Sequence, residues 1–404
     1  MNNKTRNIVV TAVFVLFMAF IVIMSGFKYA NPTAESEAER RPLAQFPEEL
    51  TIHGIIDGMG LEEGKDYSFG EKMARFNKSL GRSFKLIIDK TAISEFESYS
   101  VDQFPFREFF RGVKAKFQMN VLNLKENNGL AVEDGHIAKI EQDFNDGMLD
   151  FSIGRLEYVY NTYLKGKVEN AYIALIPDKN YFFAKDYGYV GPDYDELINR
   201  LQTTFPQMKY INLFNSLSLD DYYRTDTHWS QDKIGDVMHT LGKEMGFEDR
   251  ISYEYEKNTH HPFYGVYHGQ SALKPSPDTI TYLTNDAINK MKVFDYLTNS
   301  TNSVYDFEKL TGKDGYEFFL SGSKPLLRID NPNATTDREL VLFRDSFGSS
   351  IAPLMSEGYK SVYVVDIRYV APMIVNNMID FEGKDVLFLY SSTILNTNAF
   401  TTQP

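Results

Sequence analysis

The chain has 404 residues, 43% apolar and 24% charged, so it is long enough for one large globular domain or two smaller ones. Its formal net charge of −13 disfavours binding to a nucleic-acid backbone, and no nucleic-acid partner is expected. The chain contains no cysteine, which excludes disulfide bonds, thiolate zinc sites and a cysteine nucleophile.

The N-terminal segment predicts a membrane-spanning helix. Lys4 and Arg6 precede an uncharged run over residues 7–27, and a helix of that length spans roughly 30 Å, the thickness of a bilayer core. We interpret residues 1–6 as a cytoplasmic tail and residues 7–27 as a signal anchor; a cleaved signal peptide is the alternative. Basic residues before the run and the acidic segment ESEAE after it predict a single-pass membrane protein with its N-terminus inside.

The part of the chain after the anchor is therefore expected to be extracytoplasmic. Residues 28–47 contain three prolines and predict a juxtamembrane linker to a domain over residues 48–404. Helices are expected over residues 68–80, 90–103 and 106–124. In the last of these, apolar residues recur at helical spacing. Their common face is expected to pack into a core rather than to form a partner interface; it comprises Phe109, Val113, Phe117, Val121 and Leu124.

Short apolar runs then alternate with helical segments. This order predicts an α/β fold, a sheet with helices on both faces. Residues 251–333 interrupt the order with segments rich in Tyr, Pro and Gly. We expect this part to be an insertion that packs near the sheet edge and lines a cleft. The strand-like runs are residues 170–177, 209–214, 339–343, 360–366 and 385–390, and the helical segments among them are 193–205, 349–358 and 372–379.

The stretch YYRTDTHWSQDK, residues 222–233, carries the first candidate for chemistry. It places Asp226 two residues before His228, beside the single tryptophan, Trp229. In an extended segment residues i and i+2 point to the same side, so the carboxylate can bond Nδ1 and leave Nε2 to face a serine. A structural turn is one alternative. Half of a metal site is the other, with further ligands from His260, His261 and His268.

Ser346 is the candidate nucleophile. In VLFRDSFGSS, residues 341–350, an apolar strand runs into Asp345 and Ser346 and then into an expected helix. Open α/β sheets bind their ligands at the carboxyl ends of the strands, where Ser346 is expected. A helix N-terminus there offers N–H groups to a developing oxyanion. Taken alone, Ser346 is better explained as a helix N-cap. Together with a base that a carboxylate orients, it becomes an activated nucleophile.

These stretches resemble the DHHW family, named for Asp-His-His-Trp, and the alginate O-acetylation proteins of the SGNH hydrolase-like superfamily. YYRTDTHWS resembles the family signature, with Thr227 in place of its first His. The likeness runs from about Glu39 to the C-terminus, in short blocks whose order is specific. The other blocks are AERRPLAQFP, YSVDQFPFRE, ALIPDKNYFF, FYGVYHGQSA with PDTITY, RDSFG and VVDIRY.

The resemblance implies an SGNH-hydrolase-like α/β/α domain. It implies Ser346 as nucleophile, His228 as general base and Asp226 as the carboxylate that orients it. The implied function is an O-acyl, chiefly acetyl, transferase or esterase that acts on a cell-surface polysaccharide without a cofactor. A polytopic membrane O-acyltransferase is the implied candidate partner. Two other classes stay open: a non-catalytic polysaccharide-binding or assembly subunit, and a metal-dependent hydrolase.

The loop over residues 262–271 supplies candidates for the rest of the site. The backbone N–H groups of Ser346 and Gly265 are candidate oxyanion donors, because no asparagine is placed by a motif for that role. Tyr264 and Tyr267 offer ring faces on which a sugar can stack. A glycine-containing turn on a β-hairpin is the alternative reading of this loop.

Arginines also lie near the motifs. Arg344 replaces the glycine of the family's Gly-Asp-Ser block, which puts the usual close backbone approach there in question. Arg224 and Arg368 are candidates for binding an acidic sugar or for steadying Asp345. An ion pair at the surface is the alternative for each.

Overall fold

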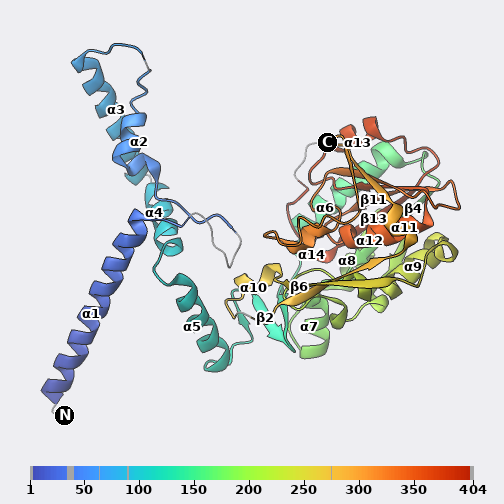
Figure 1. Cartoon of the computed structure of the whole chain (residues 1–404), viewed down its shortest axis with the longest axis horizontal. Coiled ribbons are helices and arrows are strands. Elements are labelled where there is room, and N and C mark those ends of the chain that lie inside the picture. Colours follow the sequence, from blue (N-terminus) through green and yellow to red (C-terminus); the bar gives the residue numbers. More distant parts are fainter. Residues whose placement is uncertain (1–2, 34–40, 63, 89–90, 274, 401–404) are drawn as a thin grey trace. The chain divides into compact units, whose positions relative to one another are not determined.

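The computed structural model describes residues 3–33, 41–62, 64–88, 91–273 and 275–400 (Figure 1). The chain divides into two compact units, Met1–Phe117 and Gln118–Pro404. The domain boundary expected at residue 48 stays a prediction. In the structure residues 48–117 group with the N-terminal helix.

The first unit is helical. Its helix α1 contains Val10–Ala30, a segment long and apolar enough to be a membrane span or a signal. The expected linker lies partly outside the described residues; at its described end, Arg41 donates to both carboxylate oxygens of Asp102, at 2.7 and 2.6 Å. The elements are α1 Asn3–Ala30, η1 Glu48–Leu50, α2 Ile52–Asp57, α3 Phe69–Ile88, α4 Thr91–Asp102 and α5 Arg107–Asn120.

The apolar face of α5 does not pack into a core, so that prediction is wrong. The exposed fractions of Phe109, Val113 and Phe117 are 66%, 49% and 51%. Helical periodicity predicted the helix itself, because the 3.6-residue repeat reports which side chains share a face. The repeat does not report what that face meets.

The second unit is built on an eight-stranded sheet of order β5-β4-β13-β11-β12-β10-β8-β9. The first five strands are parallel and correspond to the five predicted strands, which are confirmed. They read as continuous apolar runs because both of their faces are covered. The strands are β5 Lys209–Asn212, β4 Asn170–Ile176, β13 Asp385–Ser391, β11 Glu339–Arg344, β12 Ser361–Val365, β10 Leu326–Asp330, β8 Lys292–Asp295 and β9 Ser300–Asn302.

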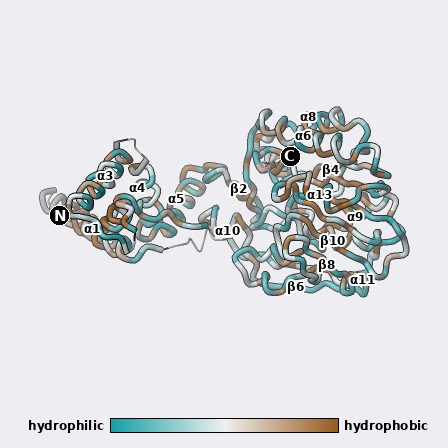
Figure 2. The backbone as a smooth tube through the Cα atoms, turned by 90° about the horizontal axis from the view of Figure 1, so that it is seen from above, coloured by the Kyte–Doolittle hydropathy of each residue, from teal (hydrophilic) through white to brown (hydrophobic). Residues whose placement is uncertain are grey.

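Helices cover both faces of this sheet and create two cores (Figures 1 and 2). Along β13, Leu387 and Leu389 face one core while Val386 and Phe388 face the other, as the two-residue period of a strand requires. Helices α9 Gly235–Met245 and α12 Gly348–Met355 cover the first core; α6 Asp146–Val159, α8 Tyr194–Thr204 and α13 Pro372–Met378 cover the second. Two further helices are α7 Lys179–Tyr187 and α14 Ser392–Leu395.

Residues 251–333, expected as an insertion at the sheet edge, extend the sheet itself. They supply the strands β10, β8 and β9, which pair antiparallel beyond β12. They also form a two-stranded ribbon, β6 Glu256–Phe263 with β7 Asp278–Thr284, and the short helices α10 Val266–Gln270, α11 Asp286–Lys290 and η7 Gly315–Phe318. A separate three-stranded sheet comprises β1 Glu126–Asn127, β2 Leu130–Glu133 and β3 His136–Lys139.

Candidate functional site

The candidate residues gather at the carboxyl ends of the parallel strands. Ser346 follows β11 in the middle of the sheet, and the loop with Asp226 and His228 comes after β5. Lys179 follows β4, which lies between these two strands with β13. Loops that leave this edge meet because parallel strands all end on the same side.

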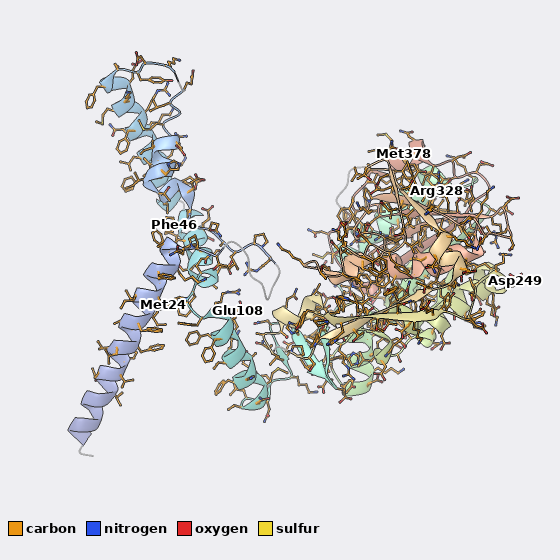
Figure 3. All side chains as sticks on the ribbon, in the orientation of Figure 1. Met24, Phe46, Glu108, Asp249, Arg328 and Met378 are labelled. Atoms are coloured by element: carbon orange, nitrogen blue, oxygen red, sulfur yellow. The ribbon has the colours of Figure 1, made fainter. Side chains whose placement is uncertain are left out.

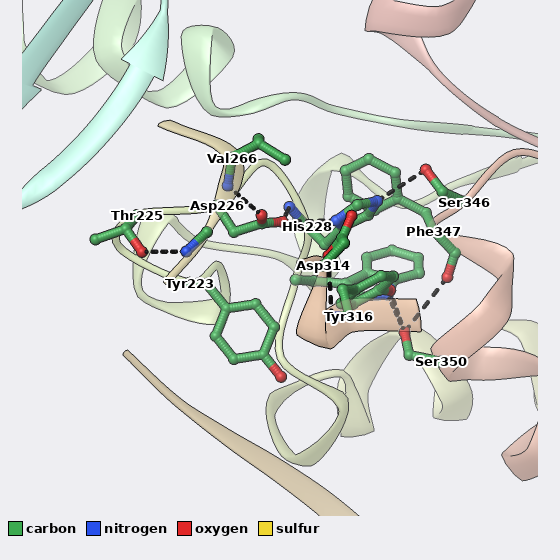
Figure 4. A network of polar contacts seen from close by, with 12 residues as sticks. Tyr223, Thr225, Asp226, His228, Val266, Asp314, Tyr316, Ser346, Phe347 and Ser350 are labelled. Atoms are coloured by element: carbon green, nitrogen blue, oxygen red, sulfur yellow. Dashed lines mark hydrogen bonds and ion pairs between the residues drawn. The ribbon is translucent and has the colours of Figure 1, made fainter. Parts of the chain in front are cut away.

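Ser346, His228 and Asp226 form one line of hydrogen bonds (Figure 4). The distance from Ser346 Oγ to His228 Nε2 is 2.8 Å, and His228 Nδ1 lies 2.6 Å from Asp226 Oδ1. Asp226 is fully buried and His228 is 6% exposed, whereas Ser346 is half-buried. The structure thus brings His228 and Ser346, which lie 118 positions apart in the sequence, into contact, in the order nucleophile, base, carboxylate.

The surroundings of Asp226 fix the orientation of the imidazole. Burial raises the pKa of Asp226, but the neighbouring His228 and the hydrogen bonds to the carboxylate outweigh burial and hold the pKa at about 2. The bonds come from the backbone N–H of His228, at 3.0 Å, and of Val266, at 2.8 Å. An ionised carboxylate only accepts, so Nδ1 carries the hydrogen and Nε2 presents its lone pair to Ser346.

Ser346 is not a helix cap. The N-cap of α12 is Phe347, and it makes no side-chain cap. The turn is held instead by Asp345, whose carboxylate accepts the N–H of Phe347 at 3.0 Å and both the N–H and the Oγ of Ser391 at 2.8 and 2.6 Å. The N-cap alternative is therefore wrong, and the Ser346 hydroxyl is left for His228.

Arg344 fits into this turn because of a glycine. Its side chain is fully buried and lies 3.6 Å from the carboxylate of Asp366. A Cβ placed on Gly348 would come within 2.6 Å of the Arg344 Cβ, so only glycine leaves room there. The arginine that departs from the family block is thus accommodated by Gly348, the first residue of α12.

Tyr316, on η7, supports the base and was not found from the sequence. Its ring stacks on the His228 ring with centroids 3.8 Å apart and planes 5° apart. Its hydroxyl bonds Ser350 Oγ at 2.9 Å (Figure 4). Trp229 Nε1 donates to the same oxygen at 2.9 Å. The tryptophan beside His228 therefore serves to tie the loop to α12. No local motif marks Tyr316, because it lies 88 residues after His228 in the sequence.

The loop at residues 262–271 borders the site, but not as an oxyanion donor. The Gly265 N–H donates to Thr225 Oγ1 at 2.9 Å, so it is not directed at Ser346. A Cβ at Gly265 would lie 2.3 Å from the Thr225 carbonyl oxygen, which explains the glycine. The Gly265 assignment is corrected accordingly: its role is close approach to the loop that carries Asp226.

The two tyrosines of that loop differ. The ring of Tyr267 is half-buried, with Lys179 Nζ 5.8 Å from its centroid, and burial raises its pKa. Tyr264 is 41% exposed and its ring meets His268 edge-on, at 4.6 Å between centroids. Of the two predicted stacking faces, Tyr264 presents one to solvent.

The two arginines predicted near the substrate contact other groups of the protein. Arg368 donates from Nε and Nη2 to Asp366 at 2.8 and 2.6 Å, with 11% of its side chain exposed, so it forms a largely buried ion pair and not a surface one. Asp345 is held by Ser391 and not by Arg368. The Arg224 side chain lies against Gly135 in the turn between β2 and β3.

Lys179 lies beneath the loop that carries Asp226. Its Nζ donates to the carbonyl oxygens of Tyr223, Arg224 and Asp226, at 2.8, 3.1 and 3.0 Å. The side chain is buried, and burial lowers its pKa to about 7, although Asp226 and Asp278 act in the opposite direction. The block ALIPDKNYFF contains this lysine, and a lysine just after a buried apolar strand is the sequence signal that marks it.

His136, on β3, predicts a pH effect on stability. Burial, with Lys179 and Arg224 nearby, lowers its pKa from 6.5 to about 4. The unfolded chain therefore takes up a proton near pH 6.5 that the folded chain takes up only near pH 4. The contribution of neutral His136 to stability is fully present above pH 6.5 and is lost progressively as the pH falls from 6.5 to about 4. We expect an unfolding free energy roughly 2 kcal/mol lower at pH 5 than at pH 8 from this group.

Denaturant unfolding of the wild type and of His136→Gln at both pH values measures this contribution. Between pH 8 and pH 5 the unfolding free energy of the variant should fall by about 2 kcal/mol less than that of the wild type. An equal pH dependence in both proteins would contradict the assignment to His136.

The metal-site hypothesis requires at least three ligand side chains close together. Among the residues that the structure describes, no three His, Asp or Glu side chains form such a group. His261 Nδ1 lies 3.1 Å from the Asp278 carbonyl oxygen and 3.2 Å from Thr279 Oγ1, within the β6–β7 ribbon. Its ring is thus used to join the two strands.

The family resemblance is confirmed by comparison with known proteins. The family model described as DHHW protein matches residues 209–365, which contain Asp226, His228 and Ser346. No curated protein sequence matches the chain.

Solved structures share the fold of the chain. A DHHW family protein from Eubacterium siraeum is 21% identical, with a TM-score of 0.55, over 68% of this chain and 94% of that one. PatB1 from Bacillus cereus, solved with a sulfonyl adduct, is 18% identical, with a TM-score of 0.52, over 68% of this chain and 98% of its own. The expected SGNH-hydrolase-like α/β/α fold is confirmed.

Proposed function

We propose that the chain is a membrane-anchored, extracytoplasmic serine O-acyltransferase or esterase that acts on a cell-surface polysaccharide. The observation that carries the proposal is the line from Ser346 Oγ through His228 to Asp226, with 2.8 and 2.6 Å between the bonded atoms. A serine hydroxyl is a weak nucleophile unless a base takes its proton, and here an oriented base is in contact.

The reaction runs through an ester of Ser346. Its Oγ attacks the carbonyl carbon of an acyl donor while His228 Nε2 takes the hydroxyl proton. When the tetrahedral intermediate collapses, the bond to the leaving oxygen breaks and His228 returns the proton to it. A sugar hydroxyl, or water in the esterase reaction, then attacks the acyl-serine, and its proton passes through His228 back to Ser346. The Ser346 N–H, at the turn into α12, is the proposed oxyanion donor.

The location and the acceptor rest on other features. Lys4 and Arg6 precede the apolar segment of α1, which supports a single pass with the N-terminus inside. The family resemblance supports acetyl as the acyl group, a polysaccharide as the acceptor and a polytopic membrane O-acyltransferase as the supplier of the acyl group. The exposed ring of Tyr264 supports binding of a sugar.

The test of the proposal is an acyl-enzyme at Ser346. The full-length protein in detergent should release acetate from an aryl acetate, and mass spectrometry of a rapidly quenched sample should find the acetyl group on the peptide with Ser346. A sulfonyl fluoride should label the same peptide; PatB1 has been solved with a sulfonyl adduct.

The variant for this test is Ser346→Ala, and Ser349→Ala, on the helix α12 that follows, is its control. We expect Ser346→Ala to lose at least about 10³-fold in kcat/KM and all labelling, because the nucleophile is gone. Ser349→Ala should keep both. Full activity of the Ser346→Ala variant would favour the metal-dependent alternative. Complete loss of wild-type activity on addition of a chelator would favour it as well.

The acceptor prediction concerns Tyr264. We expect Tyr264→Ala to weaken transfer to a polysaccharide at least tenfold while hydrolysis of an aryl acetate stays within about twofold, since contacts remote from the reacting bond assist only the large acceptor. Tyr253→Ala, at a similarly exposed ring, is the matched control. Equal losses of Tyr264→Ala on both substrates would mean that the ring supports the fold.

A further inference from the structure

Two helices of the first unit, α3 and α5, carry exposed apolar side chains; Figure 3 draws the side chains on the ribbon. On α5 these are Phe109, Val113 and Phe117, described above. On α3, Phe69, Met73 and Phe84 are 79%, 44% and 59% exposed. The residues recur at steps of four or at a sum of steps of three and four, so each set lies on one side of its helix.

Both helices are basic in an acidic protein. Helix α3 has five Lys or Arg and one Glu, a net charge of +4, and α5 has four and one, a net charge of +3. The whole chain carries −13. On α5 the exposed Lys114 and Lys116 flank the apolar row on its two sides. An apolar row flanked by lysines is the pattern of helices that lie in a membrane interface, where the charges reach anionic headgroups.

A direct contact links α5 to the candidate membrane span. Phe106, the residue before α5, stacks on Phe20 of α1, with ring centroids 5.8 Å apart and planes 14° apart. Phe20 lies seven residues before Phe27, the last residue of the uncharged run, which is roughly 10 Å along a helix. Interfacial helices bury their apolar side chains to a depth of about 5–10 Å. The entry to α5 is therefore at the depth of the outer lipid layer when α1 crosses the bilayer.

We propose that α5 lies in the outer headgroup layer of a bilayer that contains anionic lipids. Its apolar row enters the boundary between headgroups and acyl chains, and the flanking lysines contact the lipid phosphates. The proposal commits to a lipid surface as the occupant because charge and the contact with α1 both favour it over a protein. It rests on the proposed anchoring by α1 and is independent of the catalytic proposal.

The absence of cysteine makes a labelling test direct. Single cysteines replace Val113 on α5, Val15 in the apolar segment of α1 as a lipid reference, and Asp249, with 81% of its side chain exposed, as a water reference. Each full-length variant carries a spin label and is reconstituted into vesicles of phosphatidylcholine with phosphatidylglycerol, or of phosphatidylcholine alone. Collision with oxygen reports lipid, and collision with a water-soluble nickel chelate reports water.

In vesicles with phosphatidylglycerol we expect the label of Val113→Cys to resemble that of Val15→Cys, with severalfold less nickel access than Asp249→Cys. Nickel access should rise when phosphatidylglycerol is omitted, and also in Lys114→Gln with Lys116→Gln. Nickel access like that of Asp249→Cys in both vesicles would overturn the proposal, as would a label shielded from oxygen and nickel alike, which means a protein partner or a second copy. Nickel access at Val15→Cys would refute the anchoring itself, a result that leaves the acyl-enzyme test unaffected.

Discussion

Asp226→Asn should lower kcat/KM for an aryl acetate by about 10³–10⁴-fold, the scale lost when the carboxylate of a Ser-His-Asp triad becomes an amide. An amide can donate to His228 Nδ1, which favours the tautomer with the hydrogen on Nε2. In that tautomer Nε2 has no lone pair for the Ser346 hydroxyl. The carboxylate also loses its charge, which the imidazolium formed during the reaction needs beside it.

The fold should survive this change, because the Asn oxygen can still accept a backbone N–H from His228 or Val266. Asp236→Asn, at an exposed position on α9, is the matched control for the chemistry of the substitution. Steady-state kinetics and thermal unfolding of both variants separate an effect on catalysis from an effect on stability. Activity of Asp226→Asn within tenfold of the wild type, with the fold intact, would mean that His228 does not act as the oriented base.

The parallel strands and the acid-base motif could be predicted from the sequence because their signals are local. A strand covered on both faces must be apolar throughout, as β4 and β13 are. The last two strands of the sheet order, β8 and β9, could not be predicted because they are short and mix polar with apolar residues, as KVFD and STN show. Pairing with a neighbouring strand, and not local composition, makes them strands.

The support around the triad could not be predicted, because it depends on contacts between distant segments. Tyr316 reaches His228 only after the residues following β9 fold back over the loop that carries the base. The contact of Gly265 could not be predicted for the same reason. The sequence predicts a close backbone approach at Gly265. The direction of its N–H, toward an oxyanion or toward the Thr225 hydroxyl, depends on the local backbone conformation, which residue spacing does not determine.

Lys179 is the further residue on which we expect the site to depend strongly. Lys179→Met should lower kcat for an aryl acetate by about 10²-fold or more with little change in KM. The three carbonyl groups that Nζ now bonds belong to the loop that carries Asp226, and a displacement of about 1 Å at a catalytic group has an effect of that size. A lysine that touched the substrate would change KM as well.

The pH dependence separates this positioning role from a purely structural one. Three hydrogen bonds need all three hydrogens of the ammonium group, and the pKa of Lys179 is about 7 because burial opposes the charge. Above that pH the neutral amine has two hydrogens, so one carbonyl group loses its partner and kcat/KM of the wild type should fall. Lys179→Met has no such proton and should lack this alkaline fall. Lys185→Met, on the same helix α7, is the matched control and should behave as the wild type. An alkaline fall that persists unchanged in Lys179→Met would assign it to another group.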